Sequence, residues 1–318
     1  MAMLNANPRL IYTPSFDLRT VFPFLEPVSR TAVLLRPVRA TVPDPFASKF
    51  GGRIAWPQSE QWPRCPHHAA PHVPVLQLRR DNFPELPFPA SADLLQILWC
   101  PEDLHPEAAL RPSQNVTEPL DDGFTLLLPL PTFRWRMVSQ LSAQRLLGEM
   151  PKPTVPVTNP HMPHECSLNP VRVTEFPLSE ELITASQLEQ VENWVRENAR
   201  QDFEAMNIDP DSGATDFAMQ FSVAPGSKVG GFEHFSQYRP EAKCPNCEAK
   251  MSHLLTISSS EYGENDAKRW HPYDQNGSVL PLDYDECSGI CIGDLDQYFA
   301  HVCLRCEERP IIFQSSTQ

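Results

Sequence analysis

The chain has 318 residues, a length that allows two domains of ordinary size. Its formal net charge of −14 argues against general nucleic-acid binding, which needs a positive surface for the phosphate backbone. The 35 prolines exclude long helical bundles, because an interior proline breaks a helix. The N-terminal stretch lacks a cationic start followed by an apolar run, and no apolar run reaches the ~20 residues that cross a bilayer. We therefore expect a cytoplasmic protein that does not enter the membrane.

Apolar and β-branched runs predict a series of short strands. In chain order they are expected at 31–39, 73–78, 94–99, 124–128, 216–223, 252–258 and 297–302. One long helix is expected at 187–206, where Ser186 and Glu189 fit a capping box. Its apolar stripe predicts a core-facing side and consists of Leu188, Val191, Trp194 and Val195.

One stretch of the sequence occurs twice. The pentad at 48–52, Ser-Lys-Phe-Gly-Gly, recurs at 227–231 as Ser-Lys-Val-Gly-Gly. The ungapped match over 48–78 holds 9 identities in 31 positions, where unrelated stretches would share roughly two. We infer an internal duplication. The paired glycines predict either a tight turn or a nest of backbone N–H groups in which Lys49 or Lys228 helps to hold an anion.

The predicted fold class is α+β, with pseudo-duplicated, mostly antiparallel β-sheet units, one long helix and a zinc-knuckle clip. The first repeat unit is expected at 1–150, with its core at 31–100. A stiff Pro-rich connector is expected at 151–177, and the helix with the second, cysteine-bearing unit at 178–318.

Two Cys-x2-Cys pairs predict a structural zinc site. The pairs are Cys244 with Cys247 and Cys303 with Cys306. Each turn can direct two sulfurs at one ion, and four thiolates complete the tetrahedron that structural zinc prefers. A thiol redox pair and unligated cysteines are the alternatives. Because four thiolates close the coordination sphere, such a zinc would stabilise the fold and would not be catalytic.

The repeat also predicts a weaker second metal site in the first unit. Its candidate ligands are Cys65, His68, Cys100 and His105, with Asp103 as another fourth ligand. Cys65 and His68 align with the first Cys-x2-Cys pair, and Cys100 follows a strand as the second pair does. The alternatives are a degenerate zinc site with an open position and a decayed site with a buried thiol. His67 and His72 compete for the role of ligand.

Two further cysteines and the charge distribution complete the chemistry. Cys287 and Cys291 lie in an acidic stretch and predict a loop with free thiols rather than a third metal site. Residues 1–150 hold 14 basic and 14 acidic residues, whereas 151–318 hold 12 and 26. The excess predicts solvated helical and loop surfaces, or a docking surface for a basic protein partner.

The Ser-Lys-x-Gly-Gly pentads, the Cys-Pro steps at 65–66 and 244–245, and Gly293-Asp294-Leu295 before an aromatic strand resemble the YwqG-like bacterial proteins, a domain of unknown function. The resemblance covers about 31–100 and 216–306. It implies a pseudo-duplicated, mostly antiparallel α+β body and distant kinship with the eukaryotic programmed-cell-death-2 family, whose members look like chaperones of a ribosomal protein. Some YwqG-like proteins resemble immunity factors encoded beside toxins. The family has no established catalytic residues, so the resemblance implies none here.

We therefore expect a zinc-stabilised, cytoplasmic, protein-binding module of chaperone-like or toxin-immunity-like character. The alternative is a metal-dependent hydrolase or nucleic-acid processing enzyme that uses the site in the first repeat. The sequence contains neither Gly-x-Ser-x-Gly nor His-Glu-x-x-His, so the binding module is favoured over the enzyme.

Overall fold

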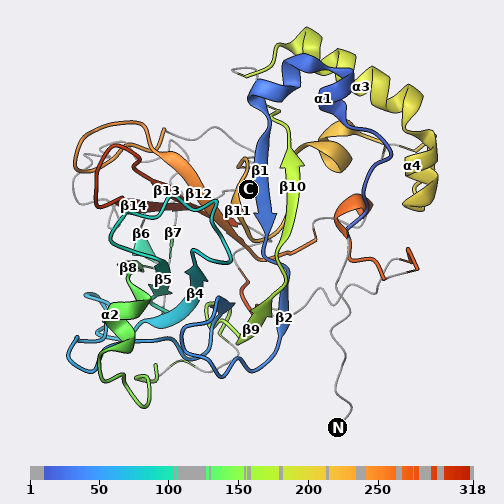
Figure 1. The fold of residues 1–318 in the computed structure, drawn as a ribbon. Coiled ribbons are helices and arrows are strands. Elements are labelled where there is room, and N and C mark those ends of the chain that lie inside the picture. The colour runs from blue at the N-terminus through green and yellow to red at the C-terminus, as the bar shows by residue number, and fades with distance from the viewer. Residues whose placement is uncertain are drawn as a thin grey trace. The chain divides into compact units, whose positions relative to one another are not determined.

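The computed structural model describes residues 11–315 apart from 103–104, 107–126, 129, 154, 156–158, 179–181, 213–214, 234–240, 263–266, 275, 279–287 and 292–296. The fold is α+β and dominated by antiparallel strands, which confirms the predicted class (Figure 1). Within the described residues, every helix is too short or too polar to cross a lipid bilayer.

Two six-stranded sheets contain most of the strands. The first has the order β10 (Val171–Glu175), β1 (Arg30–Leu34), β11 (Lys228–Gly230), β12 (Ser252–Ser258), β13 (Gln297–Val302) and β14 (Ile311–Ser315). The second has the order β2 (Pro37–Arg39), β9 (Cys166–Leu168), β3 (Lys49–Phe50), β4 (Val73–Arg79), β5 (Leu94–Trp99) and β8 (Pro131–Arg136). A separate pair joins β6 (His105–Pro106) to β7 (Leu127–Leu128).

The helices are few and mostly short. They are α1 (Leu18–Val21), α2 (Val138–Ser142), α3 (Ala185–Asn198) and α4 (Arg200–Ala205), with 3-10 turns at Pro23–Val28 and Lys268–Trp270 and a π-helical turn at Ala218–Ser222. The helix predicted at 187–206 is therefore present as α3 followed by α4. Its capping box is formed two residues earlier than predicted, because Thr184 Oγ1 accepts from Gln187 N at 3.2 Å and Gln187 Oε1 accepts from Thr184 N at 2.9 Å.

The chain folds into two compact units, each assembled from separate stretches. One unit comprises Met1–Arg36, Asn169–His234 and Ser260–Tyr284, and the other comprises Pro37–Leu168, Phe235–Ser259 and Asp285–Gln318. Each unit takes residues from both sides of the predicted connector at 151–177. That stretch is extended as predicted, but it also supplies β9 and β10, which pair with β2, β3 and β1.

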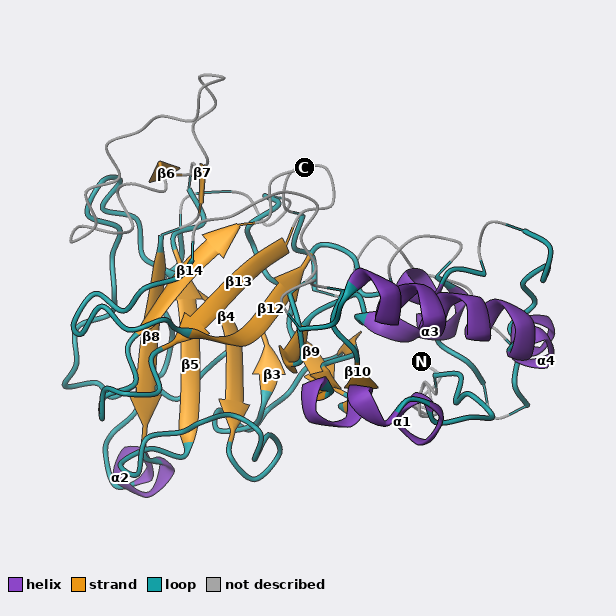
Figure 2. Cartoon of the chain, turned by 90° about the horizontal axis from the view of Figure 1, so that it is seen from above, coloured by secondary structure: helices purple, strands orange, loops and turns teal. Residues whose placement is uncertain are grey.

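The unit that holds both cysteine clusters is a β-sandwich. In Figure 2 the strands β12, β13 and β14 lie across β4, β5 and β8. Aromatic rings fill the space between these two layers: Trp99 meets Tyr298 at a centroid distance of 5.8 Å, and Phe133 meets Phe313 at 6.1 Å. Both contacts are edge-on, a favourable geometry for aromatic pairs, and they fix the two layers against each other.

The other unit has a helical core. The predicted stripe of α3 packs there, with Val191 and Val195 fully buried against Phe203 and Phe221. The strand predicted at 216–223 is wrong, because Ala218–Ser222 form the π-helical turn. Phe217 and Phe221 both pack into this core, since a spacing of four residues returns a helical side chain to the same face.

The sequence repeat has a counterpart in the structure. The order β9-β3-β4-β5-β8 matches β1-β11-β12-β13-β14 strand by strand. The register of β4 with β5 shifts between Pro74 and Leu76, and that of β12 with β13 shifts between His253 and Leu255, 179 residues further on in each case. The ends of all four strands agree with their predicted ranges to within one residue. Of the strand predicted at 124–128, only Leu127 and Leu128 lie within the described residues.

Candidate metal centre

The pairing of β12 with β13 brings the two Cys-x2-Cys turns together. Cys303 directly follows β13, whose last residue Val302 pairs with Ser252 at the start of β12. The turn that carries Cys244 lies immediately before β12. Antiparallel pairing therefore places the end of one strand beside the start of the other, and both turns meet at the same edge of the sandwich.

Each turn is closed by its own backbone hydrogen bonds. Cys244 N donates to Ala249 O at 2.9 Å, and Glu248 N donates to Cys244 O at 2.9 Å. On the other side, Cys303 N donates to Pro310 O at 3.0 Å. These bonds hold the cysteines in place independently of any ion, so the site is largely preformed.

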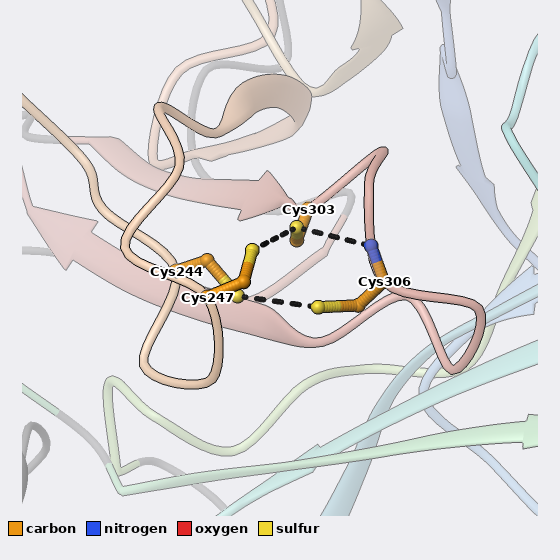
Figure 3. A group of neighbouring side chains, drawn as sticks. All are labelled: Cys244, Cys247, Cys303 and Cys306. Carbon is orange, nitrogen blue, oxygen red and sulfur yellow. Dashed lines mark hydrogen bonds between the residues drawn. The ribbon is translucent and has the colours of Figure 1, made fainter.

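The four sulfurs form a compact group (Figure 3). The Sγ atoms of Cys244 and Cys306 are 3.8 Å apart, those of Cys247 and Cys303 are 3.6 Å apart, and all four lie within 4.8 Å of one another. A tetrahedron with Zn–S bonds of ~2.3 Å has S–S edges of about 3.8 Å. We call this group the four-thiolate centre. Its sulfur spacing is that of a tetrahedral zinc site.

Backbone N–H groups also point at the sulfurs. Asn246 N lies 3.4 Å from Cys244 Sγ, and Cys306 N lies 3.4 Å from Cys303 Sγ. Such contacts stabilise the thiolate over the thiol, because the N–H dipole favours negative charge on sulfur. The two turns thus stabilise the form of cysteine that binds metals.

The protons of the four-thiolate centre are unequally held. Burial by itself raises the pKa of Cys303, but backbone N–H groups and two neighbouring thiols outweigh it and lower that pKa to about 6. Hydrogen bonding with Cys247 and, to a smaller extent, burial raise the pKa of Cys306 to about 12. A divalent cation would displace the remaining protons, because metals bind the deprotonated thiolate.

Three of the residues predicted for the second site also meet. Cys65 Sγ and Cys100 Sγ each lie 3.6 Å from His68 Nδ1, and the three donor atoms lie within 4.8 Å of one another. We call this group the first-unit cluster. Asp103 lies outside the described residues, and His105 is placed in β6 without a described side chain. The competing His67 is exposed, whereas His72 is buried and its Nδ1 lies 3.0 Å from Thr132 Oγ1.

The remaining cysteines lie apart from both clusters. Cys291 is exposed and its backbone N donates to Pro160 O at 2.9 Å, while Cys287 lies outside the described residues. Cys166 is fully buried in β9. Among the described residues, the cysteines form no disulfide.

The anion held at the second Gly-Gly step is the protein's own glutamate. Lys228 Nζ lies 2.6 Å from Glu175 Oε1, and Glu175 Oε2 accepts from Phe232 N at 2.7 Å. At the first step, Lys49 Nζ lies 3.6 Å from Glu165 Oε1. Both alternatives for the pentad are thus realised together, because the turn is tight and it also surrounds a carboxylate. Sequence reasoning missed both glutamates, since no local pattern links them to lysines so far along the chain.

Comparison of the sequence with protein-family models and with curated proteins gives no match. The resemblance to the YwqG-like proteins therefore remains a prediction.

Proposed function

We propose that the protein is a zinc-stabilised binding module for a basic protein partner, with a structural Zn²⁺ in the four-thiolate centre. The observation that carries the zinc is the sulfur geometry, with S–S distances of 3.6 and 3.8 Å between preformed turns. Four thiolates leave no position for substrate, so the metal would clip β12 to β13 and take no part in chemistry. The structural repeat supports an origin of the chain by internal duplication.

Metal content tests the zinc. Full-length protein purified under reducing conditions should contain stoichiometric zinc by mass spectrometry, and Cys244→Ser should lose one equivalent. Cys291→Ser is the matched control, because Cys291 is an exposed cysteine outside both clusters, and it should retain the wild-type content. Wild-type zinc content in Cys244→Ser would refute the site.

The charge of the helical segment supports the basic partner. Between residues 185 and 211 only Arg196 and Arg200 are basic. The exposed carboxylates of this acidic face are Glu189, Glu197, Glu204, Asp209 and Asp211. Beside them, Leu182 is 41% exposed and offers an apolar contact within the acidic surface. Such a surface attracts a basic protein and speeds its association.

The turns of the four-thiolate centre, by contrast, carry mixed charge. Their exposed charged residues are Glu241, Lys243, Glu248, Lys250, Arg305, Glu307 and Glu308. The ion pair of Lys250 with Glu241, at 2.8 Å, neutralises part of this surface. The acidic face of α3 and α4 is therefore the better docking surface for a cation.

A charge-reversal pair tests the partner. The full-length protein should bind a lysine-rich peptide at low salt and lose it as salt rises, because exposed charges are screened over ~10 Å at 0.1 M. Glu189→Lys with Glu197→Lys should weaken binding about tenfold. Glu307→Lys with Glu308→Lys changes the net charge equally and should weaken it less. Equal losses from both pairs would mean that net charge, rather than this face, attracts the peptide.

A further inference from the structure

The loop that holds Cys65 and His68 reproduces the backbone of the first metal turn. Cys65 N donates to Ala70 O and Ala69 N donates to Cys65 O, both at 2.8 Å. These are the same two bonds that close the Cys244 turn, moved by 179 residues. Ala69 also has a positive φ of 54°, as Glu248 has 56° at the equivalent position. The loop at 65–70 thus keeps a geometry that turns two side chains toward one point.

The position of Cys100 likewise matches that of Cys303. Cys100 directly follows β5, and its backbone N donates to Leu130 O at 3.0 Å, as Cys303 follows β13 and donates to Pro310 O. In the first unit, however, residues 101–129 replace the short turn that carries Cys306 in the second. The third donor is therefore kept, while the Cys-x2-Cys spacing that supplies the fourth donor is lost.

The donor distances match those of a metal site. Zn–S bonds of ~2.3 Å and a Zn–N bond of ~2.05 Å, set at tetrahedral angles, give S–N edges of about 3.6 Å. Both sulfurs lie at 3.6 Å from His68 Nδ1. A neutral ring nitrogen offers one lone pair in the ring plane, so it cannot accept good hydrogen bonds from two thiols at once. A cation between the three atoms explains both distances.

Burial of the donors is uneven. Cys65 and Cys100 are 2% and 0% exposed, whereas His68 is exposed. Two thiolates would anchor an ion from the protein side, and the imidazole would hold it from the solvent side. The described residues thus supply three donors and an approach from solvent.

We propose that the first-unit cluster is a second zinc site, with two thiolates and one imidazole as protein ligands and an exogenous water or anion in the fourth position. Two thiolates and one imidazole with a water molecule form one of the ligand sets of catalytic zinc. The site therefore differs in kind from the four-thiolate centre, because it can exchange a ligand. It goes beyond the proposed function, and its failure leaves that function untouched.

Cobalt titration of the full-length protein tests the second site, because Co²⁺ occupies zinc sites and its absorption reports the number of thiolate ligands. Metal-free wild-type protein under reducing conditions should bind two equivalents. Cys65→Ser and His68→Ala should each lose one equivalent and keep the four-thiolate spectrum. Cys244→Ser should lose the other equivalent. His67→Ala, which removes the neighbouring exposed histidine, should keep both.

Two additional measurements separate the site from a folding defect. His68→Cys should keep two equivalents and move the second spectrum toward that of a centre with more thiolates, which an unfolded protein cannot do. Azide should shift the second spectrum in wild-type protein and leave the spectrum of Cys65→Ser unchanged. A single equivalent in wild-type protein, unaffected by Cys65→Ser, would overturn the second site. Two equivalents without an azide shift would overturn its exchangeable position.

Discussion

The ammonium of Lys228 lies 2.6 Å from the carboxylate of Glu175, and the side chains are 2% and 0% exposed. Burial lowers the pKa of Lys228 and the carboxylate opposes this effect. Glu175 also accepts from the backbone N of Ala224 at 2.9 Å and of Phe232 at 2.7 Å. The pair is thus enclosed by the Ser-Lys-x-Gly-Gly turn that follows it along the chain.

Lys228→Met should lower the free energy of unfolding by about 3–5 kcal/mol, because it leaves the Glu175 carboxylate buried and without its cation. Lys49→Met provides the matched comparison. Its carboxylate, Glu165, is 26% exposed and 3.6 Å away, so water can replace part of the interaction. We expect a smaller loss of about 1–2 kcal/mol there. Urea unfolding measures both, and equal losses would contradict a special role for the buried pair.

Gly231→Ala should be strongly destabilising. Gly231 has a φ of 69°, and a Cβ there would lie 2.3 Å from Glu175 Oε2. The left-handed backbone alone costs an alanine about 1–2 kcal/mol, and the contact adds to it, so we expect about 3 kcal/mol or more. Gly148→Ala is the control, because its Cβ would have no atom within 4 Å, and it should change stability by less than ~0.5 kcal/mol. Thermal unfolding distinguishes the two.

Acid should destabilise the protein through His161. Burial lowers the pKa of this histidine from 6.5 to about 4. Below pH 6.5 the unfolded chain therefore takes up a proton that the folded chain refuses, so stability falls with pH until about pH 4. The loss over this window is about 3 kcal/mol.

His161→Phe keeps an aromatic ring beside Trp99 and should flatten the stability curve between pH 6.5 and 4. The exposed His67, changed to Phe, should leave the slope of the wild-type curve in place. A His161→Phe curve parallel to that of wild type would show that other groups cause the acid loss.

Removing metal should loosen the sandwich edge. If zinc clips β12 to β13, a strong chelator should lower the melting temperature of the wild-type protein by about 10 °C, corresponding to roughly 3–5 kcal/mol for a protein of this size. The double variant Cys303→Ser with Cys306→Ser should already melt lower and should no longer respond to chelator. An undiminished response in that variant would assign the effect to another metal site.

The sequence predicts the strands around the clusters better than the rest of the fold. The strands β4, β5, β12 and β13 are continuous apolar runs, and this pattern is strong when both faces of a strand are covered. The cysteine spacing also predicts which four residues meet. Both signals are local, since they need only neighbouring residues.

The parts that escape prediction depend on distant partners. Strands β9 and β10 lie in a Pro-rich stretch and pair with β2 and β1. The tripeptide Pro-Val-Arg occurs at both 37–39 and 170–172, a repeat whose offset of 133 differs from the main one of 179. Likewise, Ser186 and Glu189 fit a capping box as well as the residues that form it, and only the packing of the helix start decides between them.

The interleaving of the two compact units has a consequence for synthesis. Since one unit needs residues up to Tyr284 and the other begins at Pro37 and needs the strand at Ile311–Ser315, neither can close while the first half of the chain alone has left the ribosome. The β4–β5 hairpin and its loops must wait for partners translated many seconds later. Sheet edges that the finished molecule covers are exposed in this interval, so the nascent chain is a natural client for chaperones before it can bind any partner of its own.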